Sequence, residues 1–157
     1  MATFRFVTVI AAPIPVCFDL ARDIDFHTRS MAQTGERAVA GRTSGLIGLG
    51  ESVTWQARHL GVCQRLTSRI TAFDRPTHFR DEMTAGAFRS FAHDHRFEER
   101  DGGTVMTDEV VFRSPFGPLG RLVDYVFMTG YLRRLLAGRC LAIKQEAEAV
   151  ARRPAES

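Results

Sequence analysis

Between residues 51 and 113, apolar and polar side chains alternate in five successive stretches, 51–60, 62–73, 78–84, 87–99 and 104–113. The breaks between them are short and rich in turn-forming residues such as Gly61, Gly86 and the Asp101-Gly102-Gly103 run. Alternation with a period of two indicates half-buried strands. Links this short join antiparallel neighbours and leave no room for crossover helices. The sequence therefore predicts an antiparallel meander.

The segments before the meander predict two further strands and two short helices. Residues 3–10 alternate as a first strand, and 36–41 predict a short strand ahead of a glycine-rich loop. Pro13 and Pro15 favour the start of one short helix. Asp23 can cap a second helix over residues 24–31.

After the meander the period changes from two to between three and four. The helix predicted by this pattern starts at Pro118, runs to about Val150 and ends before Pro154. Gly130 and Gly138 weaken it, so we expect a bend there. The expected fold class is α+β: a curved antiparallel sheet of six to seven strands, wrapped on a long C-terminal helix, with two short helices after the first strand.

One face of the predicted sheet combines apolar and polar residues. Its apolar members are Val53, Trp55, Ala57, Val62, Leu66, Ile70, Phe79, Met83, Phe91, Phe97, Met106, Val110 and Phe112. The same face carries Glu51, His59, Gln64, Asp81, His93, His95 and Asp108. Since an unpaired buried polar group costs about 1–3 kcal/mol, a dry core would not accept so many. We expect a ligand-sized cavity between sheet and helix, unless the polar groups pair or a β-bulge reverses the faces.

Composition limits the class of protein. The length of 157 residues suits one domain, which we place at 1–151 with a polar tail at 152–157. The three cysteines show no metal or disulfide spacing and fit reduced thiols in a cytoplasmic protein. We expect no secretory leader and no integral membrane segment. The net charge of +3 is spread over scattered arginines, so we expect no nucleic-acid partner.

His93 and His95 lie two residues apart on one predicted strand, so both project to the same face. They share the inward face of the sheet with Asp81 and Asp108, and these four are the catalytic candidates. As an acid/base set they could move protons next to a carbonyl. They could equally anchor the polar end of a ligand or brace the sheet. With His59 nearby they have metal-ligand chemistry too, but an H-x-H pair alone is a weak signal. We therefore expect no metal and no cofactor.

Three other features have plain structural interpretations beside functional ones. Trp55 could stack on an aromatic ligand, although a lone Trp in a strand is more often core. The glycine cluster at 41–50 lacks the phosphate-loop pattern and is better explained as a mobile loop at the cavity mouth. The apolar run 125–128 is expected to be buried, and a homodimer or membrane contact becomes an option if it is exposed.

Three segments together resemble the START-like superfamily, also called SRPBCC or polyketide cyclase/dehydrase-like, in a bacterial subgroup. They are GLIGLGESVTWQARHLG, FRDEMTAGAFRSFAHDHRF and GGTVMTDEVVFRSPFGPLGRLVDYVF. The resemblance covers nearly the whole chain. It implies the helix-grip fold and a deep apolar cavity. Its members bind lipids, sterols, hormones or polyketides, and some catalyse cyclisation or dehydration.

The first hypothesis is therefore a binding protein for a hydrophobic or amphipathic, lipid- or polyketide-like small molecule. The second is a polyketide cyclase or dehydratase type of enzyme, in which His95 and an aspartate act as acid and base. The third is an interaction protein with a vestigial cavity, which a filled interior would favour. The predicted ligand-binding residues are Trp55, Phe79, Asp81, Met83, Phe91, His93, His95, Phe97, Met106, Asp108, Phe127 and Tyr131.

Overall fold

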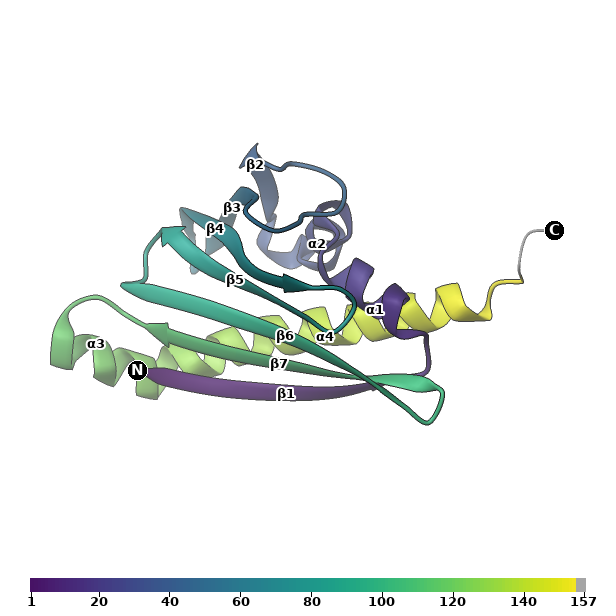
Figure 1. The fold of residues 1–157 in the computed structure, drawn as a ribbon. Coiled ribbons are helices and arrows are strands. Elements are labelled where there is room, and N and C mark those ends of the chain that lie inside the picture. Colours follow the sequence, from purple (N-terminus) through teal and green to yellow (C-terminus); the bar gives the residue numbers. More distant parts are fainter. Residues whose placement is uncertain (155–157) are drawn as a thin grey trace.

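Seven strands form one curved antiparallel sheet, and the long C-terminal helix crosses behind it (Figure 1). The structure is a computed structural model that describes residues 1–154, so the last residues of the predicted polar tail lie outside the described part. The strands are β1 (Ala2–Ile10), β2 (Arg37–Gly41), β3 (Ser52–His59), β4 (Val62–Asp74), β5 (His78–Ala85), β6 (Ser90–Arg100) and β7 (Gly103–Arg113). Their order in the sheet is β1-β7-β6-β5-β4-β3-β2. The predicted meander is confirmed, and β1 completes the sheet at the free edge of β7.

Two short helices, α1 (Ile14–Ala21) and α2 (Ile24–Ser30), follow β1 and lie toward one end of the sheet (Figure 1). Proline stands in the first turn of α1, where its missing N–H costs no hydrogen bond. The Asp23 side chain accepts a hydrogen bond from the Phe26 amide and caps α2. Both helix starts predicted from the sequence are confirmed.

The C-terminal helix consists of three consecutive segments: α3 (Gly117–Val123), the π-helical turn η2 (Asp124–Met128) and α4 (Thr129–Arg152). The irregularity thus lies at Asp124–Met128, ahead of both glycines that were expected to bend the helix. Gly130 and Gly138 lie in regular α-helix, where the position of a Cβ is open space. Asp124 is buried and accepts hydrogen bonds from the amide and hydroxyl of Ser114, which ties this turn to the end of β7. A π-helical turn of this kind interrupts the regular hydrogen-bond pattern of an α-helix.

The main core lies between the sheet, α1 and the inner face of α4. Phe18 of α1 packs edge-on against Phe73, Phe79 and Phe97, at ring-centroid distances of 5.5, 5.3 and 5.3 Å. Met106 and Ile143 are buried in the same cluster. Edge-to-face packing at this spacing suits aromatic quadrupoles. This cluster holds α1 and α4 on the sheet and fixes one wall of the site.

A β-bulge in β4 changes the face that its side chains occupy. Leu66, Ser68 and Ile70 point inward, the register against β5 then shifts between Ile70 and Ala72, and Phe73 points inward beyond it. At the other end of β4, the predicted inward residue Val62 is 57% exposed because it directly follows the hairpin turn at Gly61. Val62 is paired with His59, which lines the cavity, so it has the predicted face although its side chain is not buried.

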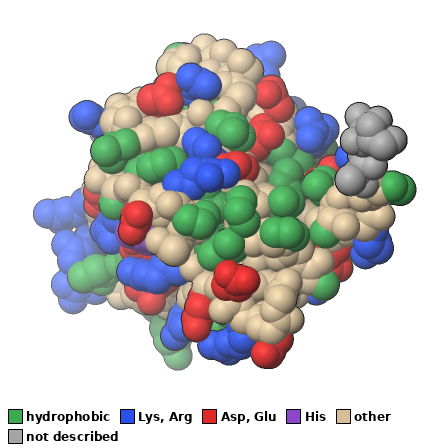
Figure 2. All heavy atoms as spheres, turned by 45° about the vertical axis from the view of Figure 1, so that its right-hand side comes forward, with side chains coloured by type: hydrophobic (Ala, Val, Ile, Leu, Met, Phe, Trp, Pro, Cys, Tyr) green, Lys and Arg blue, Asp and Glu red, His purple; other side chains and the backbone are tan. Residues whose placement is uncertain are grey.

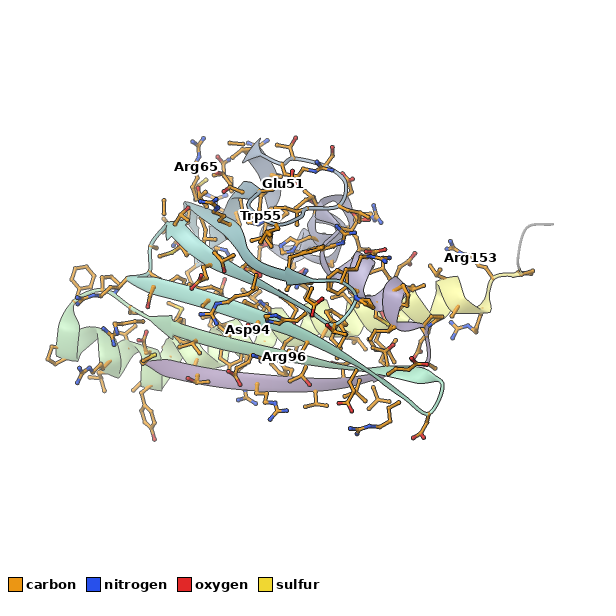
Figure 3. All side chains as sticks on the ribbon, in the orientation of Figure 1. Glu51, Trp55, Arg65, Asp94, Arg96 and Arg153 are labelled. Atoms are coloured by element: carbon orange, nitrogen blue, oxygen red, sulfur yellow. The ribbon has the colours of Figure 1, made fainter. Side chains whose placement is uncertain are left out.

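The outer face of the sheet carries its own charge network. Asp94 and Arg96 of β6 are on the face toward the viewer in Figure 3. Asp94 is buried there because Arg80 and His78 of β5 cover it, each at 2.7 Å from its carboxylate.

The basic and acidic side chains on the face in Figure 2 are interspersed around a group of hydrophobic ones. None of the helices within residues 1–154 combines the length and hydropathy needed to cross a bilayer.

The apolar run at 125–128 is not buried as expected. Tyr125 is 87% exposed, and Val126 and Phe127 are exposed as well. Phe116, Leu119 and Leu122 of the same end of the helix are also exposed. This end projects beyond the sheet, beside the N-terminus in Figure 1. Of this run, Met128 packs against the buried cluster of Phe4, Val110 and Phe112, whereas the other three side chains are exposed.

Candidate functional site

A cavity of about 180 Å³ lies between the sheet, α2 and α4. Its apolar lining consists of Ala21, Ile24, Met31, Ile47, Val53, Trp55, Leu66, Ile70, Phe79, Phe88, Phe91, Leu132, Leu135 and Leu136. Its polar lining consists of Arg22, Asp23, His27, Glu36, His59, Ser68, Asp81, His93, His95 and Arg139. An apolar wall with a smaller set of polar groups is typical of small-molecule sites. The interior is therefore hollow, which argues against a vestigial cavity.

Strand pairing places the histidines and aspartates of the inner face next to one another. His95 of β6 stands opposite Phe79 of β5 on one side and Asp108 of β7 on the other. Asp81 of β5 stands opposite His93. Because directly opposed residues in an antiparallel sheet have Cβ atoms about 5 Å apart, their side chains are within reach of one another.

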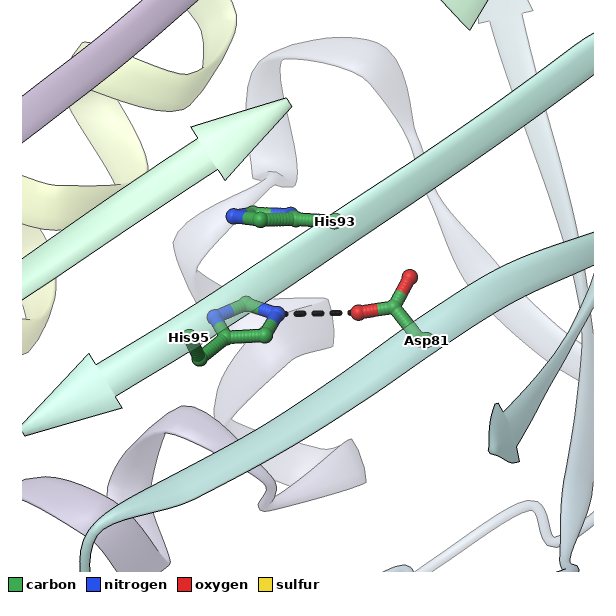
Figure 4. Close-up of side chains that lie close together, drawn as sticks. All are labelled: Asp81, His93 and His95. Atoms are coloured by element: carbon green, nitrogen blue, oxygen red, sulfur yellow. Dashed lines mark hydrogen bonds and ion pairs between the residues drawn. The ribbon is translucent and has the colours of Figure 1, made fainter. Parts of the chain in front are cut away.

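The resulting cluster is a connected set of hydrogen bonds and stacked rings. His95 Nε2 lies 2.8 Å from Asp81 Oδ2, and His93 Nε2 lies 2.9 Å from Asp108 Oδ1. The imidazoles of His93 and His95 stack with centroids 3.7 Å apart (Figure 4). Phe79 also stacks on His95, with centroids 4.1 Å apart. Cys140 of α4 donates a hydrogen bond to Asp108, with a distance of 3.4 Å between Sγ and Oδ2. The stack fixes both rings in place.

The second nitrogen of His95 has a close but poorly aligned neighbour. His95 Nδ1 lies 3.0 Å from Asp108 Oδ1, yet the angles do not make a hydrogen bond. The contact is therefore electrostatic. Both ring nitrogens of His95 face carboxylates, whereas His93 makes its hydrogen bond through Nε2 and its Nδ1 makes none within residues 1–154. Of the two histidines, His93 has the nitrogen left for a ligand.

The charges of the cluster follow from competition between burial and pairing. Burial by itself would raise the pKa of Asp108, but the hydrogen bond from His93 and the charge of His95 outweigh it and lower the pKa. The same competition lowers the pKa of Asp81. For His95, burial acts to lower the pKa, but the two carboxylates outweigh it and raise it. Burial and the neighbouring His95 lower the pKa of His93, so His93 is the neutral member.

Asp81, His93 and His95 have ligand atoms within 4.8 Å of one another, which is the proximity and chemistry that a zinc site needs. Their orientation is that of a hydrogen-bonded network. The two imidazole planes differ by only 28° and the rings stack, so their in-plane lone pairs lie in nearly parallel planes and do not converge on one metal ion. A metal would require one ring to turn away from its carboxylate.

A second polar group faces the cluster across the cavity. His27 of α2 stacks on Trp55 with centroids 4.1 Å apart, and its Nε2 lies 2.5 Å from Glu36 Oε1. Burial, together with the charge of Arg139, lowers the pKa of His27. Burial would raise the pKa of Glu36, but the hydrogen bond to His27 outweighs it and the pKa is lowered. Glu36 is thus held as a carboxylate.

A smaller cavity of about 110 Å³ adjoins the first. The two share Glu36, Trp55, His59, Leu66 and Phe88 in their linings. His59 is held in place by a 2.8 Å hydrogen bond between its Nδ1 and the hydroxyl of Tyr131. Shared side chains are the partition between the two spaces, so rotation of these side chains would join them.

The predicted ligand-binding residues divide into two groups. Six line the larger cavity: Trp55, Phe79, Asp81, Phe91, His93 and His95. The other six lie outside its lining. Phe97, Met106 and Asp108 are buried behind it, Tyr131 binds His59, and Phe127 is 43% exposed. Met83 lies beside Gly86 near the end of β5. Phe127 was therefore expected in the wrong place, because the end of the helix that carries it projects past the sheet.

The glycine-rich segment after β2 contributes Ile47 to the lining of the cavity. Hydrogen bonds tie it to α2: Gly45 O accepts from the Ile24 amide, and the Gly45 amide donates to Asp25. These bonds fix the loop against α2 and make it part of the wall.

Sequence reasoning missed the polar residues contributed by the helices and by the segment between α2 and β2. These are His27, Glu36 and Arg139. A signal existed for Arg139, because it falls at four-residue steps between Leu135 and Ile143 in the apolar stripe of α4. A charged residue inside such a stripe indicates a buried polar contact. His27 and Glu36 had no comparable pattern.

Comparison with known proteins agrees with this architecture. Residues 1–148 match the family model described as polyketide cyclase / dehydrase and lipid transport. A search of curated proteins finds no match. The crystal structure of TTHA0849 from Thermus thermophilus is similar with a TM-score of 0.77, 16% identity, and coverage of 96% of this chain and 99% of that one.

Two further structures share the fold. Ara h 8.0201 is similar with a TM-score of 0.68 and 19% identity, over 94% of this chain and 98% of that one. The major latex-like protein 151 from Panax ginseng is similar with a TM-score of 0.62 and 15% identity, over 97% and 98% of the two chains. At these identities the likeness concerns the fold. The family match over nearly the whole length shows that this chain belongs to the polyketide cyclase/dehydrase and lipid transport family, and so to the START-like superfamily.

Proposed function

We propose that this protein binds a compact hydrophobic or amphipathic small molecule in the cavity between β3–β6, α2 and α4. The observation that carries the proposal is a hollow interior with an apolar wall and polar groups at fixed positions. Sites for drug-sized ligands usually measure roughly 300–1,000 Å³. At about 180 Å³ this cavity suits a ligand of one or two rings or a short chain, and a larger one if the partition to the adjoining space opens.

Native mass spectrometry of the freshly purified protein, repeated after denaturation, is the first test. We expect a mass excess that disappears on denaturation.

A matched pair of variants locates the ligand. Leu135 of α4 lines the cavity, whereas Leu141 of the same helix is exposed. Leu135→Trp should abolish the mass excess and the binding of a fluorescent apolar probe, because the larger ring fills the cavity. Leu141→Trp should leave both unchanged. Equal binding by the two variants would contradict the proposal.

A second candidate is an enzyme that moves a proton on a bound carbonyl compound. One observation favours it: the Asp108 carboxylate orients neutral His93 through Nε2, which leaves Nδ1 as a base. This differs from the acid/base pair expected from the sequence, because both nitrogens of His95 face carboxylates. With a candidate polyketide as probe, His93→Gln should abolish turnover while binding persists. If binding is lost to the same extent, His93 only anchors the ligand.

A further inference from the structure

Arg139 is a buried cation that borders the cavity without a carboxylate partner. It is 5% exposed and lies on α4, one turn beyond Leu135. Its Nη2 donates to the carbonyl of Ala21, the last residue of α1, at 2.6 Å. Its Nε is buried with no acceptor. Across the described part of the chain, no carboxylate oxygen lies within 4.0 Å of the guanidinium. Of the five N–H donors of a guanidinium group, one therefore makes a hydrogen bond within the described part of the chain.

This state is costly for a charged side chain. Burying an ion without a partner costs several kcal/mol, which is why buried arginines are usually paired. The bond to Ala21 at the end of α1 offsets part of the cost, since a helix C-terminus carries partial negative charge. It does not supply a full counter-charge, and Arg139 Nε has no acceptor among the described residues.

The carboxylates that border the cavity are already engaged. Asp23 accepts from the Phe26 amide, Glu36 is paired with His27, and Asp81 is paired with His95. The other cation in the lining, Arg22, bonds Asp19 at 2.9 Å and the Ile47 carbonyl at 3.2 Å. The charge of Arg139 helps to lower the pKa of Glu36 and of Asp81, but Arg139 forms no ion pair with either of them in the described residues, and it lines the cavity.

We propose that the ligand carries an anionic oxygen group, such as a carboxylate, which pairs with Arg139 while the apolar body lies against Trp55, Leu132 and Leu136. This rests on the proposed function. Guanidinium groups bind carboxylates through charge-assisted hydrogen bonds, which are the strong ones in proteins. The acid supplies the missing counter-ion, so the site selects acids over neutral analogues of the same shape.

The test compares acids with their amides. Isothermal titration of the full chain uses three matched pairs: 2-naphthoate, 4-phenylbutanoate and octanoate, each with its primary amide. For the wild-type protein we expect at least one acid to bind about tenfold or more tightly than its amide, which is the range of one well-made charged contact. In Arg139→Gln this advantage should fall to within about threefold, with the amide affinity unchanged. Arg134→Gln, an exposed position on the same helix, should behave as wild type.

A second readout separates ligand binding from a structural role. If Arg139 serves the ligand, Arg139→Gln without ligand should unfold at the same urea concentration as the wild type or a higher one, because an unpaired buried charge is gone. A large drop in the midpoint would show that the bond to Ala21 is its purpose and would overturn the inference. Equal binding of acids and amides by the wild type would overturn it too, with the proposed function intact. Failure of every acid and every amide to bind would overturn both.

Discussion

The buried carboxylate of Asp108 joins two histidines of β6 and one cysteine of α4. It bonds His93, contacts His95 and accepts from Cys140, all in the interior. Burial and the Asp108 charge raise the pKa of the Cys140 thiol to about 12, so it remains a thiol donor. The contribution of Asp108 to stability comes from these three contacts acting together, because a buried polar network stabilises the fold only when its members are paired.

We predict that Asp108→Asn lowers the free energy of unfolding at pH 7 by about 3 kcal/mol, because it removes the buried carboxylate that bonds His93 and contacts His95. Urea unfolding followed by the fluorescence of Trp55, the single tryptophan, measures this. The matched control is Asp101→Asn in the exposed β6–β7 turn, where Asn accepts the positive φ of 52°. That change should stay within about 0.5 kcal/mol.

The same variant should alter the dependence of stability on pH. The pKa of Asp108 is lowered in the folded state, so its contribution is present above the unfolded pKa of about 3.9 and is lost as pH falls through the folded pKa. The wild-type free energy of unfolding should therefore fall on acidification below about pH 4. Asp108→Asn should show a shallower fall over that range. An unchanged slope would mean that Asp108 has the same proton affinity folded and unfolded.

At the scale of single residues, the sequence predicted which face of the sheet a side chain occupies better than which side chain it bonds. A period of two was enough to put Asp81, His93 and His95 on the inner side, where they line the cavity. Which nitrogen meets which carboxylate depends on strand register and ring rotation, which alternation does not encode. Arg139 is not predicted by the apolar positions of α4, since these define the stripe in which it lies without indicating a charged member.

At the scale of elements, the strands and helices were predicted closely and the exceptions have local causes. Antiparallel strands with short links have few alternatives, so the sheet followed from turn residues and alternation. The bulge in β4 did not, since one extra residue moves Phe73 to the inner face without changing the composition of the strand. The π-helical turn at Asp124–Met128 depends on the distant contact between Asp124 and Ser114.

The two ends of the C-terminal helix should differ sharply in their sensitivity to truncation. Ile143 of α4 is buried in the main core, so Ile143→Ala should cost about 2–5 kcal/mol. Val126 is 70% exposed in η2, so Val126→Ala should change the free energy of unfolding by less than about 0.5 kcal/mol. Chemical denaturation of both variants measures the difference. Comparable losses would mean that the projecting end is packed in solution, for instance against a second copy of the chain.

The whole molecule is built asymmetrically around its cavity. On one side, β1, β6 and β7 enclose the buried residues Phe4, Val110 and Phe112, which Leu132 and Leu136 of α4 cover. On the other side, β3 and β4 supply much of the cavity wall, and β2 is a five-residue edge strand with mostly exposed side chains. Side chains next to a void lack partner atoms and the contacts those atoms would provide. The sheet is therefore firmly packed on one side and lightly supported on the other.

This asymmetry predicts how the protein admits a ligand. Opening free energies within a domain range from near zero up to the global value, and lightly packed elements have the lowest ones. Native-state hydrogen exchange should show amides of β6 and β7 exchanging only on global unfolding, whereas those of β2 and β3 exchange through smaller openings. A bound acid should slow exchange in β3 more than in β7, because it fills the space beneath Trp55. Uniform exchange across the sheet would contradict this prediction, because it would show that β2 and β3 open no more easily than β6 and β7.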